Sequence, residues 1–230
     1  MSNRFTEQPA FMTDTDQLDL AALMCSRLCH DLLSPVGALT NGLELLADER
    51  DPEMRKRCFE LLDQSAKASA DKLKFFRLAF GAAGGFGESV PVDEAKSVVE
   101  ALVANSKRVE LNWALAEPRM PKGAVKVLLN FAQIGLDALV RGGTLDVGAE
   151  SRATDGMGRA SEIVVRAAGP RIAFDESIGR ALEGRLADGE LTSRTAAAHM
   201  LSMLARQAGG GLQHILSPEA LVLGAVLPEG

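Results

Sequence analysis

A long amphipathic stretch over residues 16–47 constrains this chain more than any other feature of its sequence. Apolar residues recur there at steps of three, four or seven, which predicts one helix with a continuous apolar seam. The seam consists of Cys25, Leu28, Leu32, Leu39, Leu43 and Leu46. A polar turn at 48–52 leads into a second predicted helix over 53–81, because Pro52 suits a helix start. Two long helices with a short joint predict an antiparallel hairpin.

One hairpin cannot cover all of its own apolar surface. Two copies can do so by pairing across a two-fold axis into a four-helix bundle. We therefore expect a homodimer. The polar residues 1–15 are expected to form a flexible tail, and the glycine-rich run 81–87 is expected to be a linker. These boundaries give a helical hairpin over 16–83 and a second domain over 84–230.

The second domain has a different pattern of predicted secondary structure, in which short helices and strands alternate. Helical periodicity predicts helices at 92–105, 122–140, 175–186 and 192–208. Alternation predicts strands at 109–115, 144–151, 163–167, 212–217 and 221–227, and the segment 155–158 is interpreted as a hairpin turn. This order predicts an α+β fold, a sandwich with helices on one face of a mixed sheet.

His30 is predicted to lie on the side of the first helix that faces away from the seam. At 100° per residue, it points about 200° from Leu28 and Leu32. Its own stripe is polar or small throughout and consists of Arg27, His30, Ser34, Gly37, Asn41 and Glu44. Another folded protein can approach such a face. His199 and His214, by contrast, are expected to be ordinary solvated residues.

The residues that follow His30 suggest a chemical role. Asp31 comes next, and Pro35 removes the backbone donor that would bind the Asp31 carbonyl, which is costly inside a helix. The pattern His-Asp-x-x-Ser-Pro-x-x-x-Leu resembles the H-box of two-component histidine kinases, where the histidine is phosphorylated. The resemblance implies that Asp31 orients the His30 ring for attack. Ser34 either contacts the phosphoryl group or the partner, or is an ordinary helix-surface residue.

Composition excludes several other classes of protein. The chain has 25 Lys and Arg residues and 31 Asp and Glu residues, a formal net charge of −6. It therefore lacks the overall positive charge typical of proteins that bind nucleic acid or anionic membranes. No apolar run has transmembrane length, and no secretory signal pattern opens the chain. Three cysteines make no disulfide framework, so we expect a soluble cytoplasmic protein. Cys25 and Cys29 are interpreted as small core residues rather than metal ligands.

The second domain resembles the ATP-binding domain of histidine kinases but departs from its nucleotide motifs. Kinases carry Asn-x-x-x-Asn in one helix, whereas here Asn130 is kept and Ile134 takes the second position. Kinases then carry Asp-x-Gly-x-Gly, whereas here Ala167 replaces the adenine-binding aspartate and Arg171 replaces the last glycine. The segment 192–199 lacks the glycines that let a backbone approach phosphate. We therefore expect no ATP binding.

An H-box beside a degenerate nucleotide site is similar to the dimeric histidine phosphotransferases of alphaproteobacterial phosphorelays. The resemblance implies that His30 takes a phosphoryl group from a CckA-like receiver domain of a hybrid kinase. CtrA-like and CpdR-like response regulators would be the acceptors. It also implies that the chain holds no cofactor or metal and that Mg²⁺ arrives bound to the receiver. The docking surface would comprise Arg27, Leu33, Gly37 and Asn41.

Gly37 suits close approach of a partner, although a glycine in a helix can equally be a packing site. Three other functions remain open from the sequence. The chain could be an atypical ATP-dependent histidine kinase, a scaffold that binds receivers without chemistry, or a phosphatase that drains phosphate from receivers to water.

Overall fold

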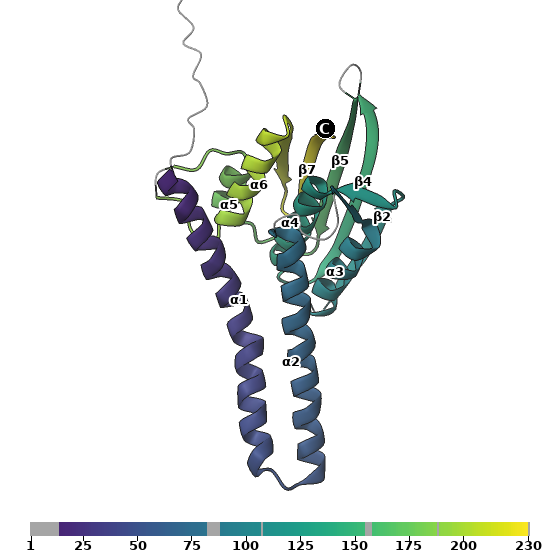
Figure 1. Ribbon diagram of the computed structural model, residues 1–230. Helices are drawn as coiled ribbons and strands as arrows, with labels where there is room; N and C mark the ends of the chain where they lie inside the picture. Colours follow the sequence, from purple (N-terminus) through teal and green to yellow (C-terminus); the bar gives the residue numbers. More distant parts are fainter. Residues whose placement is uncertain (1–13, 82–87, 107, 155–157, 188, 230) are drawn as a thin grey trace, which may run out of the picture.

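The structure, a computed structural model, describes residues 14–81, 88–106, 108–154, 158–187 and 189–229. Two long helices, α1 (Asp14–Asp48) and α2 (Pro52–Ala79), form a hairpin that projects from an α/β domain (Figure 1). The start of α2 follows from its sequence. The Asp51 side chain accepts a hydrogen bond from the Met54 N–H at 2.9 Å, and Pro52 fills the first helical position. The predicted hairpin is confirmed.

The two helices of the hairpin approach each other closely at Gly42. This residue is buried, and a Cβ atom there would come within 2.9 Å of the Leu62 side chain. The predicted seam is correct for Leu28, Leu32, Leu39 and Leu46, which are half-buried. Cys25 and Leu43 are exposed in the protomer, because α2 covers only a narrow stripe of α1, and their burial between two copies stays a prediction. Cys29 is also exposed, so the interpretation of Cys25 and Cys29 as core residues is wrong for the protomer.

The α/β domain contains a five-stranded mixed sheet of order β2-β4-β5-β7-β6. Its strands are β2 (Val109–Leu115), β4 (Gly143–Thr154), β5 (Gly158–Ala168), β6 (Gly211–Leu216) and β7 (Ala220–Glu229). The β2–β4 pair is parallel, and the other pairs are antiparallel. A separate antiparallel pair, which the sequence analysis missed, joins β1 (Ser89–Pro91) to β3 (Arg119–Pro121).

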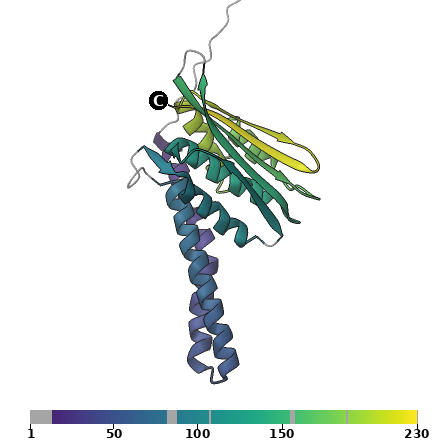
Figure 2. The same cartoon turned by 90° about the vertical axis from the view of Figure 1, so that its right-hand side faces the viewer.

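Helices cover one face of this sheet (Figure 2). They are α3 (Val92–Ala104), α4 (Lys122–Ala138), α5 (Glu176–Leu182) and α6 (Ala196–Gln207). The central strand β5 turns Ile163, Val165 and Ala167 toward them, and all three are fully buried. Leu128 and Phe131 of α4 are equally buried and belong to the same core. The predicted α+β sandwich, with helices on one face of a mixed sheet, is therefore confirmed.

The end of α2 belongs to the core of the α/β domain. Phe75, Phe76, Leu78 and Ala79 are buried and cluster with residues of α3, α4 and the sheet. Their burial anchors the hairpin where it meets the second domain. Of the predicted linker, 82–87 lie outside the described residues, as do 1–13 of the predicted tail. The division at 83–84 stays a prediction.

Several boundaries differ from those predicted. Residues 183–187 and 192–195 are not helical, so α5 and α6 are shorter than the helices predicted at 175–186 and 192–208. His214 is mostly buried and tilts against Phe174, and His199 is half-buried, so neither is an ordinary solvated residue. Residues 155–157 lie outside the described ranges, although the strands beside them pair up to Thr154 and Gly158.

Candidate functional site

His30 projects from α1 with 86% of its side chain exposed. Its Nδ1 atom lies 3.3 Å from the Asp31 Oδ1 atom. The other Asp31 oxygen lies 3.9 Å from Arg27 Nε, one helical turn back. The expectation that His30 faces away from the seam is confirmed, and the structure brings His30, Asp31 and Arg27 together in one chain of polar contacts.

The exposed ring is chemically suited to attack an electrophile. When the Asp31 carboxylate accepts a hydrogen bond from Nδ1–H, the second ring nitrogen, Nε2, carries the lone pair. The carboxylate also stabilises positive charge that develops on the ring during attack, as in other histidine–carboxylate pairs. This arrangement would let the carboxylate orient the ring for nucleophilic attack through Nε2.

His30 also lies at the edge of a cavity of about 590 Å³ between α1 and the α/β domain. The hairpin contributes Ser26, Arg27, His30 and Asp31 to its lining. Helix α4 contributes Asn130, Gln133, Ile134 and Asp137, and the ends of α5 and α6 contribute others. The histidine of this chain therefore borders the region where the resemblance to kinases would place the nucleotide.

Asp137 adds a second carboxyl group to this cavity. The surrounding protein atoms exclude water from the Asp137 carboxyl group, and this loss of hydration raises its pKa. Two contacts oppose the rise: Gln133 donates a hydrogen bond to the carboxyl group at 2.8 Å, and the positive charge of Arg27 attracts it. The negative charge of Asp31 raises the pKa further. Arg27 is thus shared between two carboxyl groups from different parts of the chain. Sequence reasoning missed Asp137, because nothing in its local pattern indicates that α4 meets α1.

The structure shows where four positions of the kinase nucleotide motifs lie in this chain. Asn130 is buried, and its amide donates to the Lys126 carbonyl of its own helix at 2.8 Å. Ile134 presents an apolar side chain to the cavity. Ala167 is fully buried in the central strand, and Arg171 is exposed. Ile134 and Ala167 thus offer no polar side-chain atom where the kinase motifs carry an asparagine and an aspartate.

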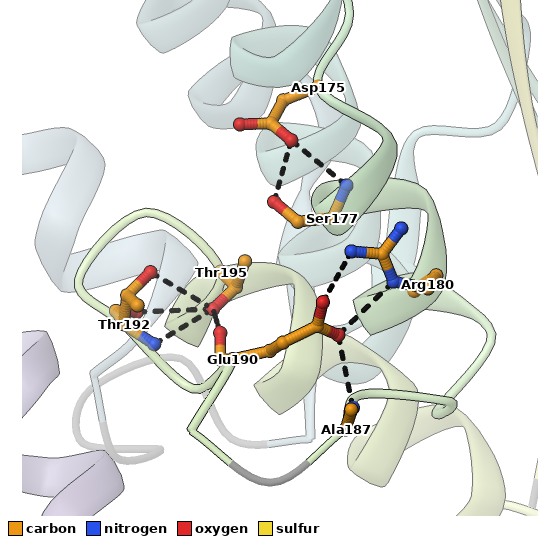
Figure 3. Close-up of polar contacts among 7 residues, drawn as sticks. All are labelled: Asp175, Ser177, Arg180, Ala187, Glu190, Thr192 and Thr195. Carbon is orange, nitrogen blue, oxygen red and sulfur yellow. Dashed lines mark hydrogen bonds and ion pairs between the residues drawn. The ribbon is translucent and has the colours of Figure 1, made fainter.

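The loop between α5 and α6 is held by its own side chains (Figure 3). Glu190 accepts hydrogen bonds from the Arg180 guanidinium and from the Ala187 N–H, and the Arg180 bond holds the pKa of this carboxyl below its ordinary value. The Thr195 hydroxyl donates to the Glu190 carbonyl at 2.7 Å and accepts from the Thr192 N–H at 2.9 Å. The Glu190 carboxylate therefore ties the loop to Arg180 of α5 and to the Ala187 N–H.

Comparison with known proteins shows the family of the chain. A family model described as the histidine phosphotransferase C-terminal domain matches residues 92–220, more than half of the chain. The chain belongs to the histidine phosphotransferase family. The protein phosphotransferase ChpT of Brucella abortus (strain 2308) is 44% identical over 138 residues, which are 60% of this chain and 64% of ChpT. The match thus spans less than two thirds of that curated relative.

A solved bacterial phosphotransferase has the same fold as this family member. The two chains are 31% identical with a TM-score of 0.77, and the alignment covers 94% of this chain and 98% of that one. Both the hairpin and the α/β domain are therefore part of the shared architecture. Identity at this level across nearly the whole of both chains supports family membership over the hairpin, which the family model itself does not cover.

The other predicted site residues of this histidine phosphotransferase follow His30 along α1. Ser34, Leu33 and Asn41 are exposed. A Cβ atom at Gly37 would meet no other residue within 4 Å, so the structure gives Gly37 no packing role within the protomer. Within the described ranges, no three side chains of His, Cys, Asp or Glu are grouped as a metal site. None of the helices in those ranges combines the length and apolarity needed to cross a bilayer.

Proposed function

We propose that this protein is a phosphorelay phosphotransferase that carries a phosphoryl group on His30. The observation that carries the proposal is the exposed His30 ring held against Asp31, on an accessible helix face of a histidine phosphotransferase family member. The donor would be the phosphorylated aspartate of a CckA-like receiver domain. The acceptors would be aspartates of CtrA-like and CpdR-like response regulators.

In the proposed first step, His30 Nε2 attacks the phosphorus of the aspartyl phosphate. A nitrogen–phosphorus bond forms, the bond from phosphorus to the aspartate oxygen breaks, and the donor carboxylate leaves with the electron pair. The second step reverses this exchange with the acceptor carboxylate as nucleophile. Such transfers depend on in-line positioning and charge neutralisation. Asp31 would fix the ring, and Arg27, Leu33, Gly37 and Asn41 would contact the receiver.

The proposal includes no ATP-dependent step. The apolar Ile134 and Ala167 stand where kinase motifs carry polar ligands, which supports this view. We propose that the chain binds no cofactor of its own and that Mg²⁺ enters with the receiver. Because receiver domains are cytoplasmic parts of two-component systems, the proposal also places the protein in the cytoplasm.

A homodimer is part of the same proposal. Large apolar side chains remain exposed on both hairpin helices, which supports a four-helix bundle between two copies. Apart from Leu33 on the proposed receiver surface, they are Leu18, Val36, Leu43, Leu45, Met54, Phe59, Leu61 and Leu73. Pairing of two hairpins would cover much of this surface.

Labelling from two sources tests the proposal against its alternatives. We expect label on the protein after mixing with a phosphorylated donor receiver, and none after incubation with labelled ATP and Mg²⁺ alone. The His30→Ala variant should take up no label. Self-labelling from ATP would show a histidine kinase instead, and receiver binding without transfer would show a scaffold. Release of inorganic phosphate without transfer to a second receiver would show a phosphatase.

A further inference from the structure

Pro35 leaves the backbone carbonyl of Asp31 without its helical partner. In a regular helix this carbonyl would accept from the N–H of the residue four positions later, which here is proline. Helix α1 nevertheless continues from Asp14 to Asp48. A carbonyl that lacks a partner is costly away from water, so a donor from elsewhere can stabilise this break.

Lys72 of α2 supplies that donor. Its Nζ atom lies 2.6 Å from the Asp31 carbonyl oxygen, across the hairpin and 41 positions along the chain. The side chain is half-buried, unlike Lys67 and Lys74 of the same helix, which are exposed and pair with aspartates of α2 itself. A bond from an ammonium group to a carbonyl is charge-assisted and stronger than the backbone bond that it replaces.

We propose that Lys72 is a positioning residue for His30. It fixes the backbone of Asp31, whose side chain contacts both the His30 ring and Arg27. Pro35 leaves the Asp31 carbonyl free, and Lys72 of α2 binds it. Through this contact, α2 helps to fix the orientation of the His30 ring on α1. This inference rests on the proposed transfer activity, because a fixed ring orientation matters most where in-line attack is required.

A double-mutant cycle with Pro35 tests this contact. Lys72→Met keeps the apolar stem and removes the donor, and we expect the rate of phosphoryl uptake from a donor receiver to fall about tenfold. Lys72→Arg should retain most of the rate. In a Pro35→Ala background the helix supplies its own N–H to Asp31, so Lys72→Met should change the rate there less than about twofold. Lys67→Met is the matched control and should transfer as the wild type does.

A second readout does not depend on transfer. The ¹⁵N chemical shifts of the His30 ring report its tautomer and hydrogen bonding, and circular dichroism reports whether each variant is folded. We expect Lys72→Met to change the His30 shifts while the protein remains folded, and Pro35→Ala to suppress that change. If the wild type transfers no phosphoryl group, the proposed function fails, and the ring shifts still test the role of Lys72.

Two results would overturn the role of Lys72. One is a Lys72→Met variant that is less stable but has wild-type His30 shifts and a wild-type rate, which would make the lysine purely structural. The other is an equal effect of Lys72→Met with and without Pro35, which would separate the lysine from the proline break.

Discussion

At the scale of single residues, the site is built from one exposed ring and the groups that orient it. The position of His30 could be predicted from the sequence, because the angular spacing of residues around a helix fixes which face each one occupies. Lys72 and Asp137 could not be predicted in this way. Each reaches the site from another helix, and no local pattern records contacts between residues 41 or 106 positions away from Asp31.

Asp31→Asn tests the orienting carboxylate directly. The amide oxygen can still accept from the ring, but the neutral bond is about half as strong as the charge-assisted one. We expect phosphoryl uptake on His30 to fall about tenfold, measured as the single-turnover rate from a phosphorylated receiver. Ser34→Ala, measured in parallel, separates its two readings, since a twofold effect or less would make Ser34 an ordinary surface residue. A wild-type rate in Asp31→Asn would exclude the carboxylate from the mechanism.

Asp137 should make stability depend on pH. The pKa of Asp137 is higher in the folded protein than the ordinary value of 3.8. Between these two pKa values the native protein holds a proton that the unfolded chain has lost. The free energy of unfolding therefore falls as the pH rises through the raised pKa. Asp137→Asn removes this titration and keeps an oxygen for Gln133. We expect the variant to melt above the wild type at neutral pH, with the difference shrinking toward pH 3.8. A constant difference across pH would contradict this, and Asp63→Asn on the exposed face of α2 is the control.

At the scale of helices and strands, regular patterns were predicted well and side-chain networks were not. Strand β2 begins and ends at the predicted residues, because its apolar side chains alternate strictly. The helices near 175–186 and 192–208 were predicted too long. Their ends are set by the Glu190 and Thr195 contacts, which compete with helical hydrogen bonds and involve residues up to ten positions apart.

The loop between α5 and α6 should loosen when its central carboxylate is removed. In Glu190→Ala, Arg180 and the Ala187 N–H both lose their acceptor. We expect amide hydrogen exchange over residues 183–195 to become faster, while α4 keeps its wild-type protection. Glu60→Ala, at an exposed position of α2, is the control. Unchanged exchange in the loop would show that these contacts do not order it.

At the scale of the whole molecule, the hairpin carries more exposed apolar surface than the protomer can cover. Contacts within one protomer half-bury Leu28, Leu32, Leu39 and Leu46, but leave Val36 and Leu43 exposed to water. These two residues are seven positions apart and therefore lie on one side of α1. Leu45 lies about 200° around the helix from Leu43, on a different side.

This geometry predicts which substitution separates the two copies. Leu43→Glu places a charge in the proposed bundle and should give a monomer at micromolar concentration by light scattering, whereas Leu45→Glu should remain a dimer. The wild type should be a dimer under the same conditions. A monomeric wild type would remove the proposed assembly, and a dimeric Leu43→Glu variant would move the interface to another face.

The central claim is that His30 carries the phosphoryl group between two receivers, and a relay assay with trace protein tests it most directly. A phosphorylated donor receiver and an unphosphorylated acceptor receiver are mixed with a catalytic amount of wild type or of His30→Ala. We predict that the wild type moves label to the acceptor through an acid-labile phosphohistidine intermediate, and that His30→Ala moves none above the rate without protein. Equal transfer by the two proteins would contradict the account.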